Sequence, residues 1–244
     1  MIKGMNYIQT KMETHLEEWV LDFSLRARKL NLKSKEHHSF MLRKMLTGDS
    51  KFFLKYRCCG FTAVAAYYLA LNLMGSANFK GCVIAPTQRA LKDIKDRIRE
   101  MASVFWGQEL ITKQGTSSVS FIENNIEFRT RDWSDPLSAC NRGLYYDTNE
   151  KFDVVIFDEI LPEKGSDFQY FVTTIPHTNQ LICGTSIVST SEFKEVLHHF
   201  KCIGYDEVEF IKMHYMMDPD NWDGEEIPNL INALGNEKFS EQFE

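Results

Sequence analysis

The feature that most constrains the fold of this 244-residue chain is a set of short runs in which every residue is apolar. These runs are residues 52–54, 82–85, 154–157 and 181–183. A strand with one solvated face alternates apolar and polar residues, whereas a strand covered on both faces is apolar throughout. The runs therefore predict a central, mostly parallel sheet with helices packed on it.

Helical patterns follow the first two of these runs. Residues 62–74 read as a helix closed by Gly75, and residues 91–101 place their apolar side chains on one face of an amphipathic helix. The order strand, helix, strand, helix is typical of an α/β fold whose sheet is flanked by helices. We therefore expect the α/β class.

Two further strand signals complete the predicted sheet. Residues 119–122 and 126–129 flank Glu123-Asn124-Asn125, which predicts a hairpin with a tight turn. Residues 208–213 predict another strand near the carboxyl end.

The two ends of the chain differ from this central pattern. Residues 1–50 hold two helical patterns, at 16–23 and 40–46, and are expected to form an N-terminal helical region. Residues 51–244 are expected to form the core together with a C-terminal helical tail that includes 230–234. No repeat or Gly/Ser-rich linker divides the chain, so we expect one main domain.

Composition narrows the possible compartments and partners. The net charge is −6, so any contact with nucleic acid must come from a local basic surface. The six cysteines form no C-x-x-C pair, which indicates reduced thiols and no structural zinc site. The chain begins without the apolar segment of a signal peptide and contains no apolar run of about 20 residues. We expect a soluble, intracellular protein.

The apolar run at 154–157 ends in two carboxylates, Asp158 and Glu159. Ligands of open α/β folds bind at the carboxyl ends of the strands, where these side chains would lie. Asp158 could hold Mg²⁺ through water, and Glu159 could position or deprotonate a water that attacks a γ-phosphate. The alternative is a strand that simply ends in solvated acids.

A possible phosphate loop lies between the run at 52–54 and the helix that follows it. The usual pattern G-x-x-x-x-G-K-[ST] is absent, but residues 55–62 read Lys-Tyr-Arg-Cys-Cys-Gly-Phe-Thr. Gly60 would allow close approach of a phosphate, and Thr62 could reach Mg²⁺. Phe61 stands where the usual lysine would be, and Lys55 could supply the missing charge. The alternative is an ordinary turn, although the order of this loop and the acidic strand favours a nucleotide hydrolase.

In this order the motifs resemble the ATPase domain of the large terminase subunit, the DNA-packaging motor of tailed bacteriophages. That family often carries a phosphate loop with its lysine at the front, as in 55–62. Residues 83–89 resemble its "APT" segment, and Arg142-Gly143 resembles an Arg-Gly pair that precedes the acidic strand. Residues 183–186 resemble its Ser/Thr coupling motif. The resemblance extends from about residue 36 to the end of the chain.

The resemblance implies a P-loop NTPase of the RecA/ASCE type that uses ATP and Mg²⁺. Catalysis would depend on Glu159, Lys55 and Arg142, the last as an arginine finger that reaches a neighbouring subunit. Thr185 would sense the γ-phosphate, and Mg²⁺ would be held by Thr62 and Asp158. The nucleotide-binding positions would be Lys55, Arg57, Cys58, Cys59, Gly60, Phe61, Thr62, Asp158 and Thr185.

The resemblance also implies partners. They would be double-stranded DNA, the portal protein, the small terminase subunit and further copies of the chain in a ring on the procapsid, in the cytoplasm of the infected bacterial host and away from any membrane. Nothing in the sequence could form the RNase H-like nuclease domain that usually follows in terminases, so we expect no DNA cleavage by this chain.

Departures from the family pattern and two alternatives accompany this interpretation. His37-His38 stand where the family often has a glutamine for adenine, and we interpret these histidines as surface or packing residues. A superfamily 2 helicase-like ATPase shares the acidic strand but needs a second RecA-like domain. A catalytically inactive interaction module is suggested by Phe61 and Cys58, whereas intact Lys55 and Asp158-Glu159 favour an enzyme.

Overall fold

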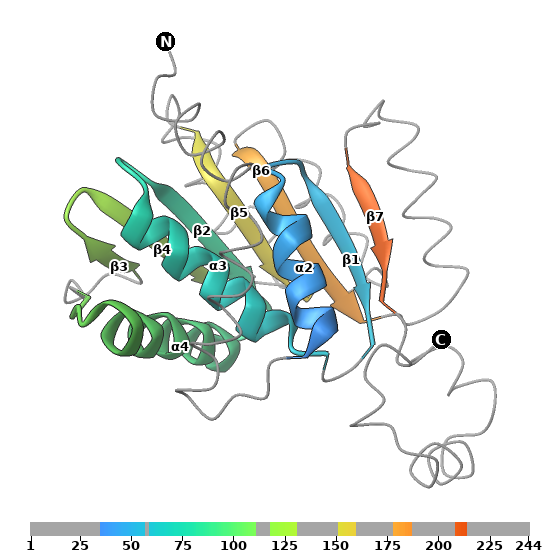
Figure 1. The fold of residues 1–244 in the computed structure, drawn as a ribbon, viewed down its shortest axis with the longest axis horizontal. Helices are drawn as coiled ribbons and strands as arrows, with labels where there is room; N and C mark the ends of the chain where they lie inside the picture. The colour runs from blue at the N-terminus through green and yellow to red at the C-terminus, as the bar shows by residue number, and fades with distance from the viewer. Residues whose placement is uncertain are drawn as a thin grey trace, which may run out of the picture.

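A computed structural model of the protein describes residues 35–56, 59–110, 118–130, 151–159, 178–186 and 208–213. In these parts, helices pack against a twisted sheet (Figure 1). The helices are α2 (Glu36–Leu46), α3 (Phe61–Gly75) and α4 (Gln88–Trp106). The strands are β1 (Lys51–Lys55), β2 (Lys80–Ala85), β3 (Ser118–Phe121), β4 (Asn124–Thr130), β5 (Phe152–Asp158), β6 (Thr178–Ser186) and β7 (Glu209–Lys212).

The seven strands form one sheet in the order β3-β4-β2-β5-β6-β1-β7. Every neighbouring pair is parallel except β3 and β4, which form an antiparallel hairpin. The predicted mostly parallel sheet flanked by helices is therefore confirmed. Because β6 lies between β1 and β5, the carboxyl ends of these three strands meet at one edge of the sheet.

The predicted hairpin exists, but its predicted turn was wrong. The turn is formed by Ile122 and Glu123, whereas Asn124 and Asn125 belong to β4. Asn124 is buried, and its side-chain amide is fully engaged in hydrogen bonds: its Nδ2 donates to Leu73 O at 2.7 Å, and its Oδ1 accepts from Phe79 N. Asn124 therefore links the end of α3 to the residue that precedes β2, and it does not form the turn.

Helix termini follow local capping chemistry. α3 ends at Gly75, as predicted. α4 is longer than its apolar pattern suggests because the hydroxyl of Thr87 accepts from Ala90 N at 3.2 Å, while Gly107 closes the helix in a left-handed conformation. None of the described helices has the length and apolar content needed to cross a membrane.

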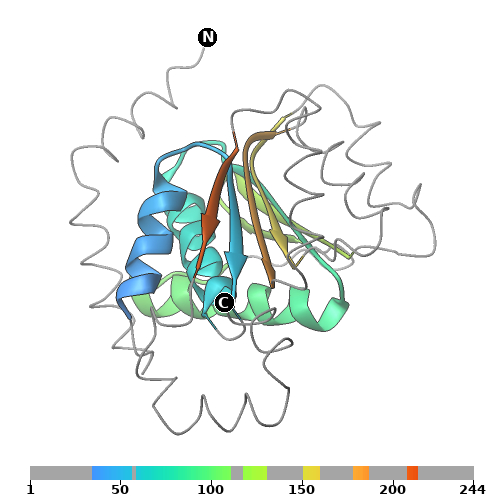
Figure 2. The same ribbon diagram turned by 90° about the vertical axis from the view of Figure 1, so that its right-hand side faces the viewer.

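Two hydrophobic clusters cover the two faces of the sheet. The first joins β-strand residues such as Phe53, Ile156 and Ile182 to all three described helices. The second contains their neighbours on the strands, including Leu54, Phe157 and Cys183. Figure 2 shows α2 and α3 on one side of the strands. The alternation between clusters tells which face each strand residue occupies.

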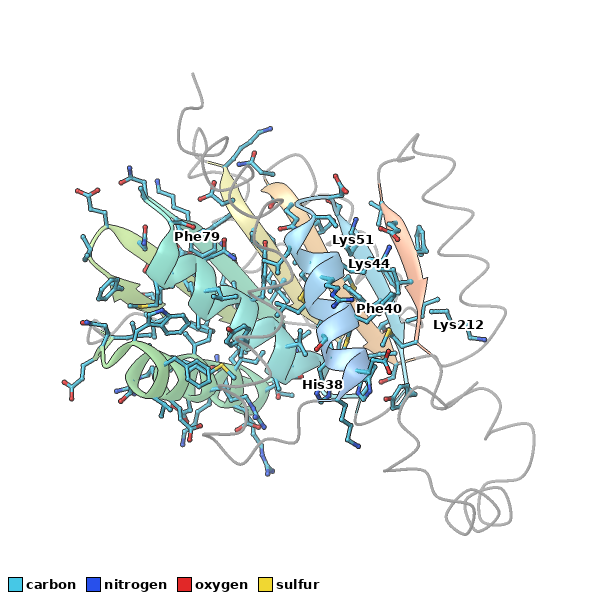
Figure 3. The ribbon with its side chains drawn as sticks, in the orientation of Figure 1. His38, Phe40, Lys44, Lys51, Phe79 and Lys212 are labelled. Carbon is cyan, nitrogen blue, oxygen red and sulfur yellow. The ribbon has the colours of Figure 1, made fainter. Side chains whose placement is uncertain are left out.

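An ion-pair cluster ties β7 to α2 and β1 at the amino ends of the strands. Lys51 is 1% exposed, and its Nζ lies 2.9 Å from Glu209 Oε2 and 3.3 Å from Asp49 Oδ2. Lys44 donates to the other oxygen of Glu209. Figure 3 labels Lys44 and Lys51. Hydrogen bonds from Lys44 and Lys51 hold the pKa of Glu209 below its ordinary value.

Candidate nucleotide-binding site

The described part of the predicted phosphate loop leads into α3 at Gly60. This glycine has φ of +79° and precedes the first residue of the helix. A Cβ atom there would lie 2.3 Å from His38 Nε2, so both the backbone conformation and the packing require glycine. Two predicted site residues, Arg57 and Cys58, lie outside the described residues, as does Arg142.

Lys55 is the last residue of β1, and its side chain lies between two carboxylates. Its Nζ is 3.5 Å from Asp158 Oδ1 and 3.0 Å from Glu159 Oε2. Burial lowers the pKa of Lys55, but the attraction of Asp158 and Glu159 outweighs burial and raises the pKa above its ordinary value. Lys55 is therefore a buried ammonium group at the edge of the sheet.

Asp158 meets the start of α3. The hydroxyl of Thr62 donates to both of its carboxylate oxygens, at 3.2 and 3.1 Å. A carboxylate and a hydroxyl are hard oxygen ligands of the kind that Mg²⁺ takes, with waters and phosphate oxygens completing its coordination. In the part of the chain that the structure describes, no group of three or more His, Cys, Asp and Glu residues could hold a metal. The donor set fits a Mg²⁺ ion that arrives with a phosphate ligand.

Glu159 has an unusual backbone and a firmly held side chain. Its φ is +74°, a left-handed conformation that costs on the order of 1–3 kcal/mol for a residue other than glycine. Its N–H donates to Gly184 O at 2.8 Å, and its Oε1 accepts from Ser186 N at 2.7 Å. Strained residues of this kind cluster at functional sites.

Ser186 lies at this edge of the sheet, although only Thr185 was singled out from the sequence within the motif at 183–186. It lies opposite Lys55 in the register of β1 and β6, and its hydroxyl lies 3.4 Å from Glu159 Oε2. Thr185, which was predicted to sense the γ-phosphate, is 2% exposed, and its hydroxyl donates to Ser186 O at 3.4 Å. The signal that could have found Ser186 is alternation along β6.

Alternation places the key residues on one face of the sheet. Phe53, Ile156 and Ile182 belong to the cluster that contains the helices, so the residues two positions later point to the same side. Those residues are Lys55, Asp158 and Gly184, and Ser186 follows Gly184 by two more. Thr185 points to the opposite face.

Phe61 stands at the sequence position of the usual lysine, but its side chain lies in the hydrophobic core. It is buried, packs against Phe53 with 5.7 Å between ring centroids, and fills the space above Gly184. The Nζ of Lys55 lies 5.1 Å from the centre of the same ring. Phe61 therefore packs the start of α3 against the sheet, and its ring contacts the ammonium group of Lys55.

Cys59 is a buried member of the loop. Burial raises the pKa of its thiol to about 11, so the side chain is a neutral thiol at physiological pH. The described residues that the structure brings together at this edge are thus Lys55, Cys59, Gly60, Phe61, Thr62, Asp158 and Glu159.

No protein-family model matches the sequence, and no curated protein was found to be similar to it. Solved structures do match. The ATPase domain of the large terminase from Thermus phage P74-26 is 14% identical, with a TM-score of 0.59 over 89% of this chain and 95% of that one. A large terminase from a thermophilic bacteriophage, solved in complex with ADP, is 13% identical, with a TM-score of 0.56 over 80% and 47%.

A hypothetical ATP-dependent RNA helicase from Sulfolobus tokodaii is 17% identical, with a TM-score of 0.52 over 78% of this chain and 56% of that one. The fold is that of a RecA-like P-loop ATPase. Within that class it resembles the ATPase domains of phage large terminases over most of the chain, and the similarity at these identities is one of fold.

Proposed function

We propose that this chain binds ATP with Mg²⁺ at the carboxyl edge of β1, β5 and β6, and that it hydrolyses ATP. The observation that carries the proposal is the convergence, at one edge of the sheet, of Lys55 from β1, Thr62 from α3, and Asp158 and Glu159 from the carboxyl end of β5. The thermophilic phage terminase has been solved with ADP and with ATP-γ-S, which supports a nucleotide as the ligand.

ATP binding would have to break the ion pairs that Lys55 forms with Asp158 and Glu159. Lys55 now neutralises Asp158 and Glu159, so phosphate oxygens would compete with these carboxylates for its ammonium group. Asp158 and Thr62 would hold Mg²⁺, which supplies charge neutralisation to the phosphates when it is bound. Arg57 and the backbone N–H groups at the start of α3 would complete the phosphate contacts.

Glu159 is suited to orient the attacking water. Ser186 N–H fixes one oxygen of its carboxylate, and its side chain is 25% exposed, so it is accessible from the site. When Lys55 moves toward the phosphates, the other oxygen loses its ammonium partner and becomes free to accept a hydrogen bond from water.

We further propose that hydrolysis powers the packaging of double-stranded viral DNA into a procapsid. The lysine at the front of the phosphate loop and the likeness to terminase ATPase domains support this role over a helicase-like one. Copies of the chain would form a ring with the portal protein and the small terminase subunit. Arg142 would act as the arginine finger between neighbouring copies.

Steady-state ATP hydrolysis tests the proposal. Lys55→Ala and Glu159→Ala would be compared with wild-type protein at high protein concentration, with and without double-stranded DNA. Lys212→Ala is the matched control, because Lys212 is an exposed lysine on neighbouring β7 (Figure 3). We expect turnover in wild type and Lys212→Ala and none in the other two. Equal turnover in all four proteins, or none in wild type under any condition, would contradict the proposal.

A further inference from the structure

The first turn of α2 contacts the predicted phosphate loop through His37 and His38. His37 is 1% exposed, and its Nε2 lies 3.0 Å from the carbonyl oxygen of Cys59. A carbonyl can only accept a hydrogen bond, so Nε2 carries the hydrogen and donates it. The hydroxyl of Tyr56 lies 3.3 Å from the same nitrogen. One imidazole thus contacts the residues on both sides of positions 57 and 58.

His38 contacts the next residue of the loop. Its Nε2 lies 2.3 Å from the position that a Cβ on Gly60 would take, and its ring centroid is 4.2 Å from that of His37. Its Nδ1 accepts from Lys35 N at 3.3 Å, which fixes the orientation of the ring. Figure 3 shows His38 at the end of α2 that lies nearest the start of α3. Consecutive residues of α2 therefore contact consecutive residues of the loop.

α2 itself is fixed, so it gives the loop a rigid support. Met41, Leu42 and Met45 are completely buried in the helix-covered cluster. The carbonyl of Met45 accepts from Gln180 Nε2 on β6 at 2.7 Å, and Lys44 is paired with Glu209 on β7. The helix is held to the sheet at the end opposite the histidines.

We propose, building on the nucleotide site proposed above, that His37 is a positioning residue that holds the phosphate loop in its ligand-binding shape through the carbonyl of Cys59. A loop that binds phosphates through backbone N–H groups has to present them in fixed directions, and disorder in the free loop weakens binding. His37 acts on phosphate binding through the loop and makes no contact with the base of the nucleotide.

A series of substitutions at one position tests the hydrogen bond. Glutamine places an amide N–H near the position of Nε2, whereas asparagine is too short to reach the carbonyl and methionine has no donor. We would measure the Kd of ATP and of GTP, the kcat of ATP hydrolysis and the unfolding temperature for wild type, His37→Gln, His37→Asn and His37→Met.

We expect His37→Met and His37→Asn to weaken ATP and GTP alike, by about tenfold, because the buried carbonyl loses its donor. His37→Gln should recover most of the affinity, and kcat should change less than Kd. If His37→Met does not fold, the comparison of His37→Gln with His37→Asn still tests the hydrogen bond to Cys59 O, since both side chains are amides and only glutamine is long enough to reach the carbonyl.

Three results would overturn the role of His37. The first is equal affinity in all variants while wild type binds nucleotide, which leaves the proposed nucleotide site standing. The second is loss of ATP binding with unchanged GTP binding, which would indicate a contact with adenine. The third is wild-type protein that binds neither nucleotide, which contradicts the proposed function and this role together.

Discussion

Strand β1 begins and ends with a buried lysine, and the two lysines have different surroundings. Lys51 is paired with Asp49 and Glu209, whose side chains are 72% and 41% exposed. Lys55 is paired with Asp158 and Glu159, whose side chains are only 10% and 25% exposed. The same residue type on the same strand is thus neutralised by well-exposed acids at one end and by mostly buried acids at the other.

We interpret this difference as one between a structural ion pair around Lys51 and an ion pair of the proposed nucleotide site around Lys55. The acids around Lys51 can stay hydrated, so the cluster fastens α2, β1 and β7 without any further ligand. The acids around Lys55 are less exposed than those around Lys51: Asp158 accepts hydrogen bonds from Thr62, and Glu159 has a left-handed backbone conformation. Buried charges of this kind are seldom retained for stability alone. The comparison predicts opposite consequences for the two lysines.

The largest expected effect comes from exchanging each lysine for methionine, which keeps the stem and removes the charge. Lys55→Met should reduce ATP hydrolysis by at least about 100-fold, because the charge that would face the phosphates is lost. Lys51→Met should lower the free energy of unfolding by about 1–3 kcal/mol, since a buried pair with solvated partners is broken, and should retain its turnover per folded molecule. ATPase assays and urea unfolding measure both quantities.

The comparison fails if Lys51→Met loses turnover as completely as Lys55→Met while remaining folded. Both ends of β1 would then act on the site, and the division between a structural and a functional lysine would be wrong.

A pair of glycines sharpens the comparison at the functional end. Gly60→Ala should cost about 2–4 kcal/mol of stability, because the left-handed backbone is strained and the new Cβ would meet the ring of His38. Gly75→Ala, at the other end of α3, is the control: nothing lies within 4 Å of its Cβ position, so its stability should stay level or rise slightly. Urea unfolding of both variants checks this, and equal costs would contradict the packing described for Gly60.

The smallest expected effect is a pH dependence at the structural end. The pKa of Glu209 is lower in the folded protein than its ordinary value, so the cluster adds stability above that ordinary value of about 4.3 and loses it as pH falls through the folded pKa. Glu209→Gln should therefore be less stable than wild type at pH 7, and the difference should shrink below pH 4. Urea unfolding from pH 7 to pH 3 measures it. A difference that stays constant with pH would show that the ionised carboxylate is not responsible.

Much of the fold followed from the sequence because it depends on local patterns. The apolar runs at 52–54, 82–85, 154–157 and 181–183 became β1, β2, β5 and β6, and 208–213 contains β7. The insertion of β6 between β1 and β5 could not be predicted, since the order of strands depends on crossover connections that leave no periodic signal. The first predicted helix, near 16–23, and the tail near 230–234 lie outside the described residues.

The site followed from the sequence only in part. Lys55, Thr62, Asp158 and Glu159 converge, as their order along the chain suggested. Ser186 was not singled out because the resemblance to the coupling motif implied a role for Thr185. The side chain of Thr185 points to the opposite face of the sheet, whereas the N–H of Ser186 donates to Glu159. The interpretation of His37 as a surface or packing residue was incomplete, because the structure buries it and bonds it to the loop. Long-range partners of this kind are set by packing.

The most direct test of the central claim is to separate binding from hydrolysis at Glu159. Glu159→Gln keeps the size of the side chain but cannot serve as a base, so we predict that it binds ATP with nearly wild-type Kd and hydrolyses it at least about 100-fold more slowly in a single turnover. Control unfolding curves would establish that the variant is folded. Hydrolysis by Glu159→Gln at the wild-type rate would contradict the assignment of this carboxylate as the group that orients the attacking water.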